Sequence, residues 1–211
     1  MMEKYKPTFV AIILFFTYAL VPSPARAGAL TDQIRKTVEE IIAILKDPKL
    51  KSDDKAKERR DLLRQAIYAR FDFTEMSMRS LGRHWRRLTP EERKEFVKLF
   101  ADLLERTYTN RIESFNDERF IYLREILDGD YGVVRGRVVT EKGEEYTLNY
   151  KARLANGEWK VYDVVVENIS LVNNYRSQFK RVIRKKSYEE LISIMKEKQI
   201  DTDVGKEKEK K

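Results

Sequence analysis

The sequence predicts an α+β fold in which helices come first, an antiparallel sheet of four to five strands follows, and further helices end the chain. Apolar residues recur at helical spacing as far as residue 113. Between residues 121 and 167 they alternate with polar residues, and turn sequences interrupt the alternation. Helical spacing returns after residue 173. Because these periods are typical of amphipathic helices and half-buried strands, we expect a sheet packed against several helices.

The N-terminal helices are expected over residues 30–45, 53–70, 74–81 and 90–113. The last of them has the clearest start. Thr89 can cap it, Pro90 suits its first turn, and Glu92 three residues after Thr89 completes a capping box. Its apolar stripe continues to Ile112, so this helix is long enough to line a whole sheet.

Four strands are expected over residues 121–127, 131–140, 144–154 and 158–167. The turn between the last two contains Asn156-Gly157, a pair that tolerates the positive φ angles of a tight hairpin. Two helices should follow, one over residues 173–185 and one that Ser187 caps together with Glu190. Short turns between successive strands predict an antiparallel meander.

Both ends of the chain differ in composition from the rest. Lys4 and Lys6 precede an apolar run over residues 9–21, and Ala25-Arg26-Ala27 resembles a cleavage site. We therefore expect a signal peptide at 1–27, with an uncleaved anchor as the alternative, although the run is short for a membrane span. A single domain is expected at 28–200. Residues 201–211 are charged and poor in apolar residues, which predicts a disordered tail.

The chemistry-bearing residue types are scarce. The 211 residues include one histidine, His84, and no cysteine, so the usual zinc clusters and disulfides are excluded. Nucleotide-binding glycine loops and the nucleophile elbow are absent as well. The formal net charge is +8, but no nucleic-acid-binding module is present. These absences favour a binding protein without cofactors over an enzyme.

Asp163 is the one candidate for acid–base chemistry. Alternation places it on the same strand face as Trp159, Val161 and Val165, where a carboxylate must be paired or neutral. A salt bridge to an arginine is the first interpretation. An enzyme that uses Asp163 as a general acid or base in a cone-shaped α+β pocket is the alternative.

Two groups of basic residues are candidates for docking. They comprise Arg83, Arg86 and Arg87 before the long helix, and Arg176, Lys180 and Arg184 on the later one. Tyr175, Phe179, Val182 and Ile183 should face inward on that later helix, which places its basic residues outward. Such a surface suits an acidic partner or an anionic membrane, and a merely solvated surface is the alternative.

Several blocks of the sequence carry a resemblance to a known family. They are residues 71–96, the long-helix pattern at 100–108, Gly-Glu-Trp-Lys-Val-Tyr-Asp-Val at 157–164, and Ile-Ser-Leu-Val-Asn-Asn-Tyr-Arg-Ser-Gln-Phe at 169–179. Together they resemble the MlaC / toluene-tolerance auxiliary family. The resemblance implies a periplasmic phospholipid carrier whose deep apolar cavity, between sheet and helices, holds the acyl chains while the head group stays in water.

The resemblance also implies partners. They are an inner-membrane ABC transporter complex with its MCE-domain protein, and an outer-membrane lipoprotein complex, between which a monomeric carrier shuttles lipid to maintain outer-membrane lipid asymmetry. A binding or chaperone module for hydrophobic peptides is a further alternative. The candidate lipid-binding residues are Met76, Leu81, Trp85, Phe96, Leu99, Phe100, Leu103, Leu104, Tyr108, Ile112, Val134, Val138, Leu148, Tyr150, Trp159, Val161, Val165, Tyr175 and Phe179.

Overall fold

The computed structural model describes residues 28–115 and 117–197. The predicted signal peptide at 1–27 and the predicted tail at 201–211 lie outside the described residues. The elements begin with the helices α1 (Ala29–Lys46), α2 (Ala56–Arg70), α3 (Phe73–Leu81) and α4 (Pro90–Glu113), with the short 3₁₀ helices η1 (Pro48–Leu50), η2 (Asp53–Lys55) and η3 (Gly82–Arg87) between them. α5 (Leu171–Lys185) and α6 (Tyr188–Lys196) follow the strands. The predicted α+β class is confirmed.

The sheet is an antiparallel meander in the order β1-β2-β3-β4-β5. Its strands are β1 (Arg119–Asp128), β2 (Tyr131–Val139), β3 (Glu145–Ala155), β4 (Glu158–Val166) and the short β5 (Ile169–Ser170). The hairpin between β3 and β4 has φ angles of 52° at Asn156 and 80° at Gly157, as the sequence predicts. In the middle of β2, Gly136 lets β1 and β2 approach closely, because a Cβ atom there would lie 2.6 Å from the carbonyl oxygen of Ile121.

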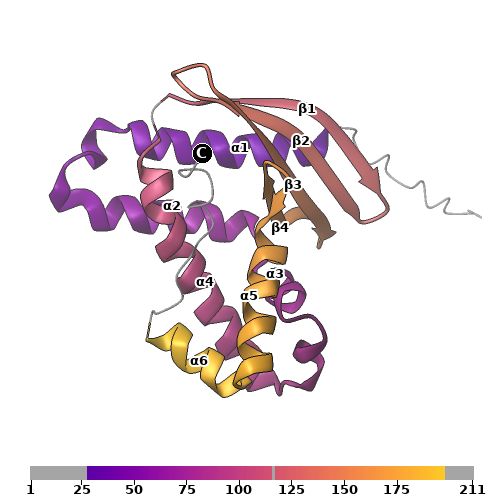
Figure 1. Cartoon of the computed structure of the whole chain (residues 1–211). Helices are drawn as coiled ribbons and strands as arrows, with labels where there is room; N and C mark the ends of the chain where they lie inside the picture. The colour runs from indigo at the N-terminus through magenta and orange to yellow at the C-terminus, as the bar shows by residue number, and fades with distance from the viewer. Residues whose placement is uncertain (1–27, 116, 198–211) are drawn as a thin grey trace, which may run out of the picture.

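The start of α4 shows the predicted capping box. The Thr89 side chain accepts a hydrogen bond from the Glu92 backbone N–H, and the Glu92 carboxylate accepts one from the Thr89 backbone N–H. The helix is long enough to line the sheet, but it does not pack along it. α1 covers the sheet instead and runs antiparallel to α2, while α4 packs mainly on α3 and α6 (Figure 1).

The described residues form two separate hydrophobic cores. The lower core joins α3, α4 as far as Leu104, α5 and α6, and is rich in aromatic side chains. Its centre contains Phe96, Phe100, Tyr175 and Phe179, and the Phe100 and Tyr175 rings meet edge to face with centroids 5.2 Å apart. The upper core joins α1 to the sheet through Leu30, Ile34, Val134, Ala152, Trp159 and Val161.

A β-bulge changes which residues of β4 face the helices. The pairing of β3 with β4 shifts between Lys151 and Ala152, so that Tyr162 is an extra residue in β4. Side chains after a bulge change face. Asp163 therefore does not share a face with Trp159 and Val161, as simple alternation predicted.

Asp163 connects the end of the sheet to α5. It is 3% exposed, and its carboxylate accepts hydrogen bonds from the Ser170 hydroxyl at 2.7 Å and the Val172 backbone N–H at 3.1 Å. The Lys151 ammonium lies 3.2 Å away. The expected buried ion pair is present, but its partner is Lys151 and not an arginine. Ser170 also caps α5 through the Asn173 N–H, so this network sets where α5 begins.

Candidate functional site

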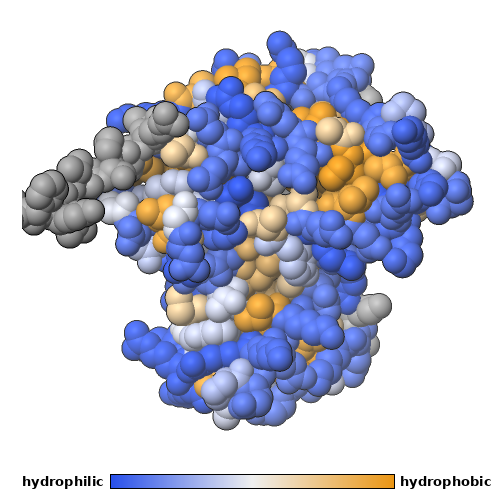
Figure 2. Space-filling view, turned by 180° about the vertical axis from the view of Figure 1, so that it is seen from behind, coloured by the Kyte–Doolittle hydropathy of each residue, from blue (hydrophilic) through white to orange (hydrophobic). Residues whose placement is uncertain are grey.

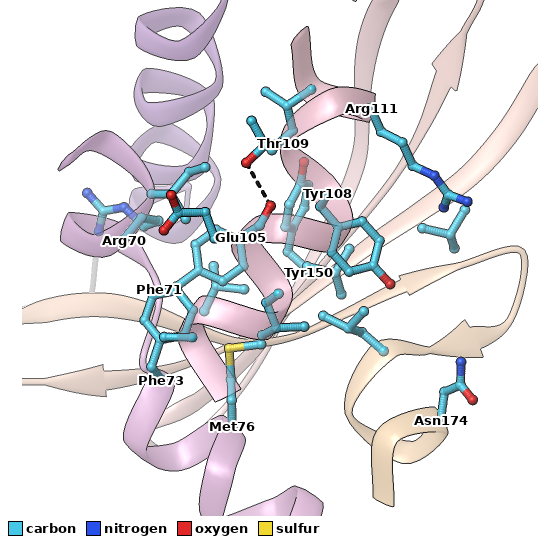
Figure 3. A pocket seen from close by; sticks show the side chains of 18 of the residues that line it. Arg70, Phe71, Phe73, Met76, Glu105, Tyr108, Thr109, Arg111, Tyr150 and Asn174 are labelled. Atoms are coloured by element: carbon cyan, nitrogen blue, oxygen red, sulfur yellow. Dashed lines mark hydrogen bonds between the residues drawn. The ribbon is translucent and has the colours of Figure 1, made fainter. Parts of the chain in front are cut away.

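A large pocket lies between the two cores. Its walls come from the sheet, the α1–α2 pair, the C-terminal half of α4 and the first turns of α5. Its volume is about 1670 Å³. Small-molecule pockets usually measure about 300–1,000 Å³, so this one can hold a ligand larger than most metabolites. Figure 3 shows the part in which α4 crosses in front of Phe71, Met76 and Tyr150.

Most of the wall is apolar. In the space-filling view, apolar surface gathers at the waist of the molecule and beside it, between surfaces that are largely hydrophilic (Figure 2). Helices and strands contribute to it alike. The apolar lining residues include Ile34, Val38, Ile41, Ile42 and Leu45 of α1, Leu63 and Ile67 of α2, Leu104 and Ile112 of α4, and Val138, Val161 and Val164 of the sheet.

Ion pairs close the edge of the pocket between α2 and α4. Arg64 of α2 makes a two-pronged contact with Glu105 of α4. About two turns further along α4, Glu113 accepts hydrogen bonds from Arg60 at 2.9 Å and from Arg59 at 3.1 Å. The hydrogen bond from Arg60, followed by that from Arg59, lowers the pKa of Glu113. The charges along this edge therefore satisfy one another.

Arg70 joins three elements behind the pocket. Its guanidinium donates to the Trp159 carbonyl oxygen at 2.6 Å, to the Gln33 amide oxygen at 2.8 Å and to the Thr37 hydroxyl at 3.1 Å. Burial lowers the pKa of Arg70. Because all of its contacts are within the protein, Arg70 fixes α1 and α2 against β4.

Two tyrosine side chains are the main polar groups of the inner wall. Burial raises the pKa of both Tyr108 and Tyr150 above the ordinary value of a phenol. The two phenols are therefore neutral at physiological pH. They can donate or accept a hydrogen bond, but they cannot act as bases there.

The structure brings some of the predicted lipid-binding residues to this pocket. They come from α3, α4, α5 and three strands, which are distant in sequence. These residues are Met76, Leu104, Tyr108, Ile112, Val138, Tyr150, Val161 and Phe179.

The other predicted lipid-binding residues lie outside the pocket wall. The first half of α4 packs against helices rather than facing the sheet, which places its stripe in the lower core. Those found in or against the lower core are Leu81, Trp85, Phe96, Leu99, Phe100, Leu103 and Tyr175. Val134 and Trp159 belong to the upper core, and Leu148 and Val165 also lie outside the wall. The bulge in β4 explains why Val165 does not line the pocket, because it turns Val164 toward the pocket instead, on the same side as Val161.

The wall contributed by α1 and α2 was missed by the sequence reasoning. The apolar stripe of α1 is evident in the sequence, but the same pattern is expected of a helix face that is buried in a hydrophobic core. What distinguishes it is partial exposure of Val38, Ile41 and Ile42, which only the assembled fold reveals.

The two predicted groups of basic residues lie close together. The Arg176 guanidinium rests against Gly82 at the start of η3, since a Cβ atom there would be 3.1 Å from its Nη2. All six predicted docking residues, Arg83, Arg86, Arg87, Arg176, Lys180 and Arg184, are exposed. Within the described ranges none of them forms an ion pair with another residue.

No catalytic or metal-binding constellation accompanies the pocket. In the described part of the chain no group of three or more His, Cys, Asp or Glu residues is placed to hold a metal ion. His84 stacks on the Tyr188 ring, with centroids 5.0 Å apart, outside the pocket. Among the described helices, none has the length and apolar character needed to span a bilayer.

Comparison with known families gives a match over most of the chain. The model of the MlaC protein family aligns with residues 35–197, which include every lining residue of the pocket except Ile34. The chain belongs to the MlaC family. Members of this family are lipid-binding carriers and not enzymes, so the enzyme alternative for Asp163 is set aside.

Two curated relatives agree with this assignment. The intermembrane phospholipid transport system binding protein MlaC of Haemophilus influenzae is 26% identical over 56% of this chain and 57% of its own length. The toluene tolerance protein ttg2D of Pseudomonas putida is 30% identical over 44% of each chain. The chain thus spans about half the length of the curated relatives that it matches.

A solved structure matches over a longer range. A phospholipid-binding protein from Ralstonia solanacearum, solved in complex with a phospholipid, superposes with a TM-score of 0.70 at 28% sequence identity. The match covers 81% of this chain and 96% of that protein.

Proposed function

We propose that this protein is a periplasmic phospholipid carrier. The acyl chains of the bound lipid lie in the pocket between the two cores. The observation that carries the proposal is the pocket itself, which is large, mostly apolar and open at an otherwise hydrophilic surface. Burial of each acyl methylene contributes about 0.8 kcal/mol, so long chains can be held without a dedicated polar site for each group. The phospholipid bound to the Ralstonia relative, which shares the fold, supports the same ligand class.

Organic-solvent extraction of the purified protein followed by mass spectrometry tests the proposal. We expect co-purified glycerophospholipid, and uptake of lipid from vesicles after delipidation. Val164→Trp should reduce the bound lipid, because it places an indole in the pocket wall. Leu123→Trp is the matched control, since Leu123 is 61% exposed on β1 and does not line the pocket. Lipid-free protein that also takes up no lipid from vesicles would contradict the proposal.

We further propose that the carrier shuttles lipid between an outer-membrane lipoprotein complex and an inner-membrane ABC transporter with its MCE-domain protein. The six exposed basic residues around η3 and α5 support docking by charge, because their charges are not neutralised by neighbours within the described ranges. Contacts that must form and release repeatedly are commonly small and electrostatic.

A triple variant tests the docking surface. Arg176→Glu, Lys180→Glu and Arg184→Glu together should slow transfer to the transporter and leave the amount of bound lipid unchanged. The defect should shrink at high salt, since about 0.1 M salt screens exposed charges beyond about 10 Å. A control with the same change of charge replaces the exposed Lys36 and Lys142 and a third exposed lysine, Lys94, by glutamate. Equal transfer rates for the two triple variants at low salt would refute the docking role.

A further inference from the structure

The two edges of the pocket beside α4 have different polar groups. On the α2 side, Arg64 and Glu105 neutralise each other, and so do Arg60 and Glu113. On the α5 side, the pocket wall includes Arg111 of α4 and Asn174 of α5. This second edge, formed by Tyr108, Arg111 and Asn174, is called the donor edge below.

Tyr108 connects the donor edge to the apolar interior. Its ring lies on the pocket wall, and the Arg111 guanidinium carbon is 5.8 Å from the ring centroid. Figure 3 shows the Tyr108 hydroxyl pointing to the side of the pocket where Arg111 and Asn174 lie. The hydroxyls of Tyr108 and of Tyr175, which is 0% exposed, are both buried and lie near each other at the α4–α5 contact. Of the two, Tyr108 lines the pocket wall, so its hydroxyl can also form a hydrogen bond with a polar group of a ligand.

The electrostatic surroundings of these hydroxyls are positive. Burial raises the pKa of Tyr175, while hydrogen bonds with Thr107 and Tyr108 and then the charges of Arg111 and Arg106 act in the opposite direction. Both guanidinium groups therefore lie close enough to affect charge at this point of the α4–α5 contact. A guanidinium has five N–H donors, so Arg111 can bind a ligand while it keeps contacts within the protein.

Asn174 adds a neutral donor. Its side-chain oxygen accepts a hydrogen bond from the Gln178 amide at 3.3 Å, which leaves the Asn174 NH₂ group to donate elsewhere. The donor edge thus offers a guanidinium, a phenol hydroxyl and an amide at the margin of an apolar pocket. Hydrogen bonds from such groups to an anionic oxygen are about twice as strong as those between neutral groups.

We propose that the donor edge binds the phosphodiester of the lipid, with Arg111, Tyr108 and Asn174 donating to its oxygens while the acyl chains enter the apolar pocket. This proposal rests on the proposed function and deepens it. It specifies that the ligand is a lipid with a phosphate attached to its glycerol. It also specifies that the protein holds the polar end of this lipid at one edge of the pocket. A free phosphate ion has the same anionic chemistry, and the experiment separates the two sources.

The test compares two ligands with identical acyl chains, a diacyl phosphatidylglycerol and a diacylglycerol, which lacks the phosphate. Wild-type and variant proteins are delipidated, and the dissociation constant for each ligand is measured by titration. Arg111→Gln and Tyr108→Phe should each weaken phosphatidylglycerol binding about ten-fold, because each removes a hydrogen bond to a charged group. Diacylglycerol binding should change less than about two-fold, which lies within the scatter of mutational effects away from a ligand's polar group.

Matched controls come from side chains away from the pocket. Arg124→Gln removes an exposed arginine of β1, and Tyr122→Phe removes a buried hydroxyl. Neither residue lines the pocket, and neither control should change binding of either lipid. Arg111→Lys should retain part of the phosphatidylglycerol affinity, because it keeps the charge but loses the forked geometry. Thermal unfolding of every variant shows that it is folded.

The outcomes are distinct. Equal losses for both ligands in Arg111→Gln would overturn the proposal, since a change of pocket shape would then explain the effect. Unchanged phosphatidylglycerol binding would overturn it too. If inorganic phosphate alone displaces phosphatidylglycerol completely, the donor edge is a site for free phosphate and the proposal is overturned. Failure of the wild-type protein to bind either lipid would instead contradict the proposed function.

Discussion

Replacement of Asp163 by asparagine tests how the sheet is joined to α5. The carboxylate receives hydrogen bonds from the Ser170 hydroxyl and the Val172 N–H, and an ionic contact from Lys151. An asparagine side chain has one acceptor oxygen in place of two and carries no charge. Lys151 loses its partner, but its side chain is 35% exposed and can turn to water, which reduces that part of the cost.

The expected loss follows from these contacts. Hydrogen bonds to a charged group contribute about 1.5–3 kcal/mol each, and breaking a fully buried pair costs about 3–5 kcal/mol. With one hydrogen bond retained and Lys151 partly hydrated, Asp163→Asn should lower the free energy of unfolding by about 2–4 kcal/mol. For a domain of this size the midpoint of thermal unfolding should fall by roughly 6–12 °C.

Urea unfolding followed by circular dichroism measures the loss, and an unchanged m-value shows that the same surface is exposed on unfolding. Ser170→Ala is a smaller perturbation of the same network and should cost about 1 kcal/mol, the usual effect of losing a helix cap. Lipid transfer by the folded Asp163→Asn protein should stay near the wild-type rate. A change in unfolding free energy below about 0.5 kcal/mol would refute the reasoning, because that is the size expected for a surface substitution.

Two further predictions concern the sheet and the α2–α4 edge. Gly136→Ala should destabilise the protein by about 3 kcal/mol, because the new Cβ would lie 2.6 Å from the Ile121 carbonyl oxygen. Gly129→Ala meets no atom within 4 Å and should cost only the roughly 1–2 kcal/mol of its positive φ, so equal midpoints in urea would contradict this account. The lowered pKa of Glu113 means that its contribution to stability is present above its unfolded pKa and is lost as the pH falls through its folded pKa. Wild type and Glu113→Gln should therefore converge in unfolding free energy between roughly pH 5 and pH 3, and a constant difference over that range would refute the assignment.

Local signals account for the parts of the fold that the sequence predicts well. The capping box at Thr89 and the hairpin at Asn156-Gly157 depend on residues a few positions apart, and both occur as expected. The boundaries of α4 agree with the predicted residues 90–113 for the same reason. Hydrogen bonding of this kind depends only on a few neighbouring residues, so it can be predicted before any tertiary contact is known.

The parts that could not be predicted depend on contacts between distant elements. Neither Tyr162 nor its neighbours in the sequence predict a bulge. The bulge nevertheless determines that Val164 and not Val165 lines the pocket. The stripes of α1 and α4 look alike in sequence, since each is an apolar helix face. Only the packing of α4 on α3 and α6 shows that its first half fills a core while α1 lines the pocket. An apolar stripe shows that one face of a helix is covered, but it does not show whether another element or a ligand covers it.

The two edges of α4 also differ in how they respond to the solution around the protein. The edge toward α2 depends on ion pairs whose arginines, Arg60 and Arg64, are 49% and 48% exposed. Near the edge toward α5, the tightly packed rings of the lower core, among them Phe100 and Tyr175, hold α4 against α5. Dissolved ions weaken attraction between exposed charges but have little effect on aromatic packing. Ionic strength, or a charged surface brought near α2, therefore acts on the contact between α2 and α4, while the aromatic contact between α4 and α5 stays in place.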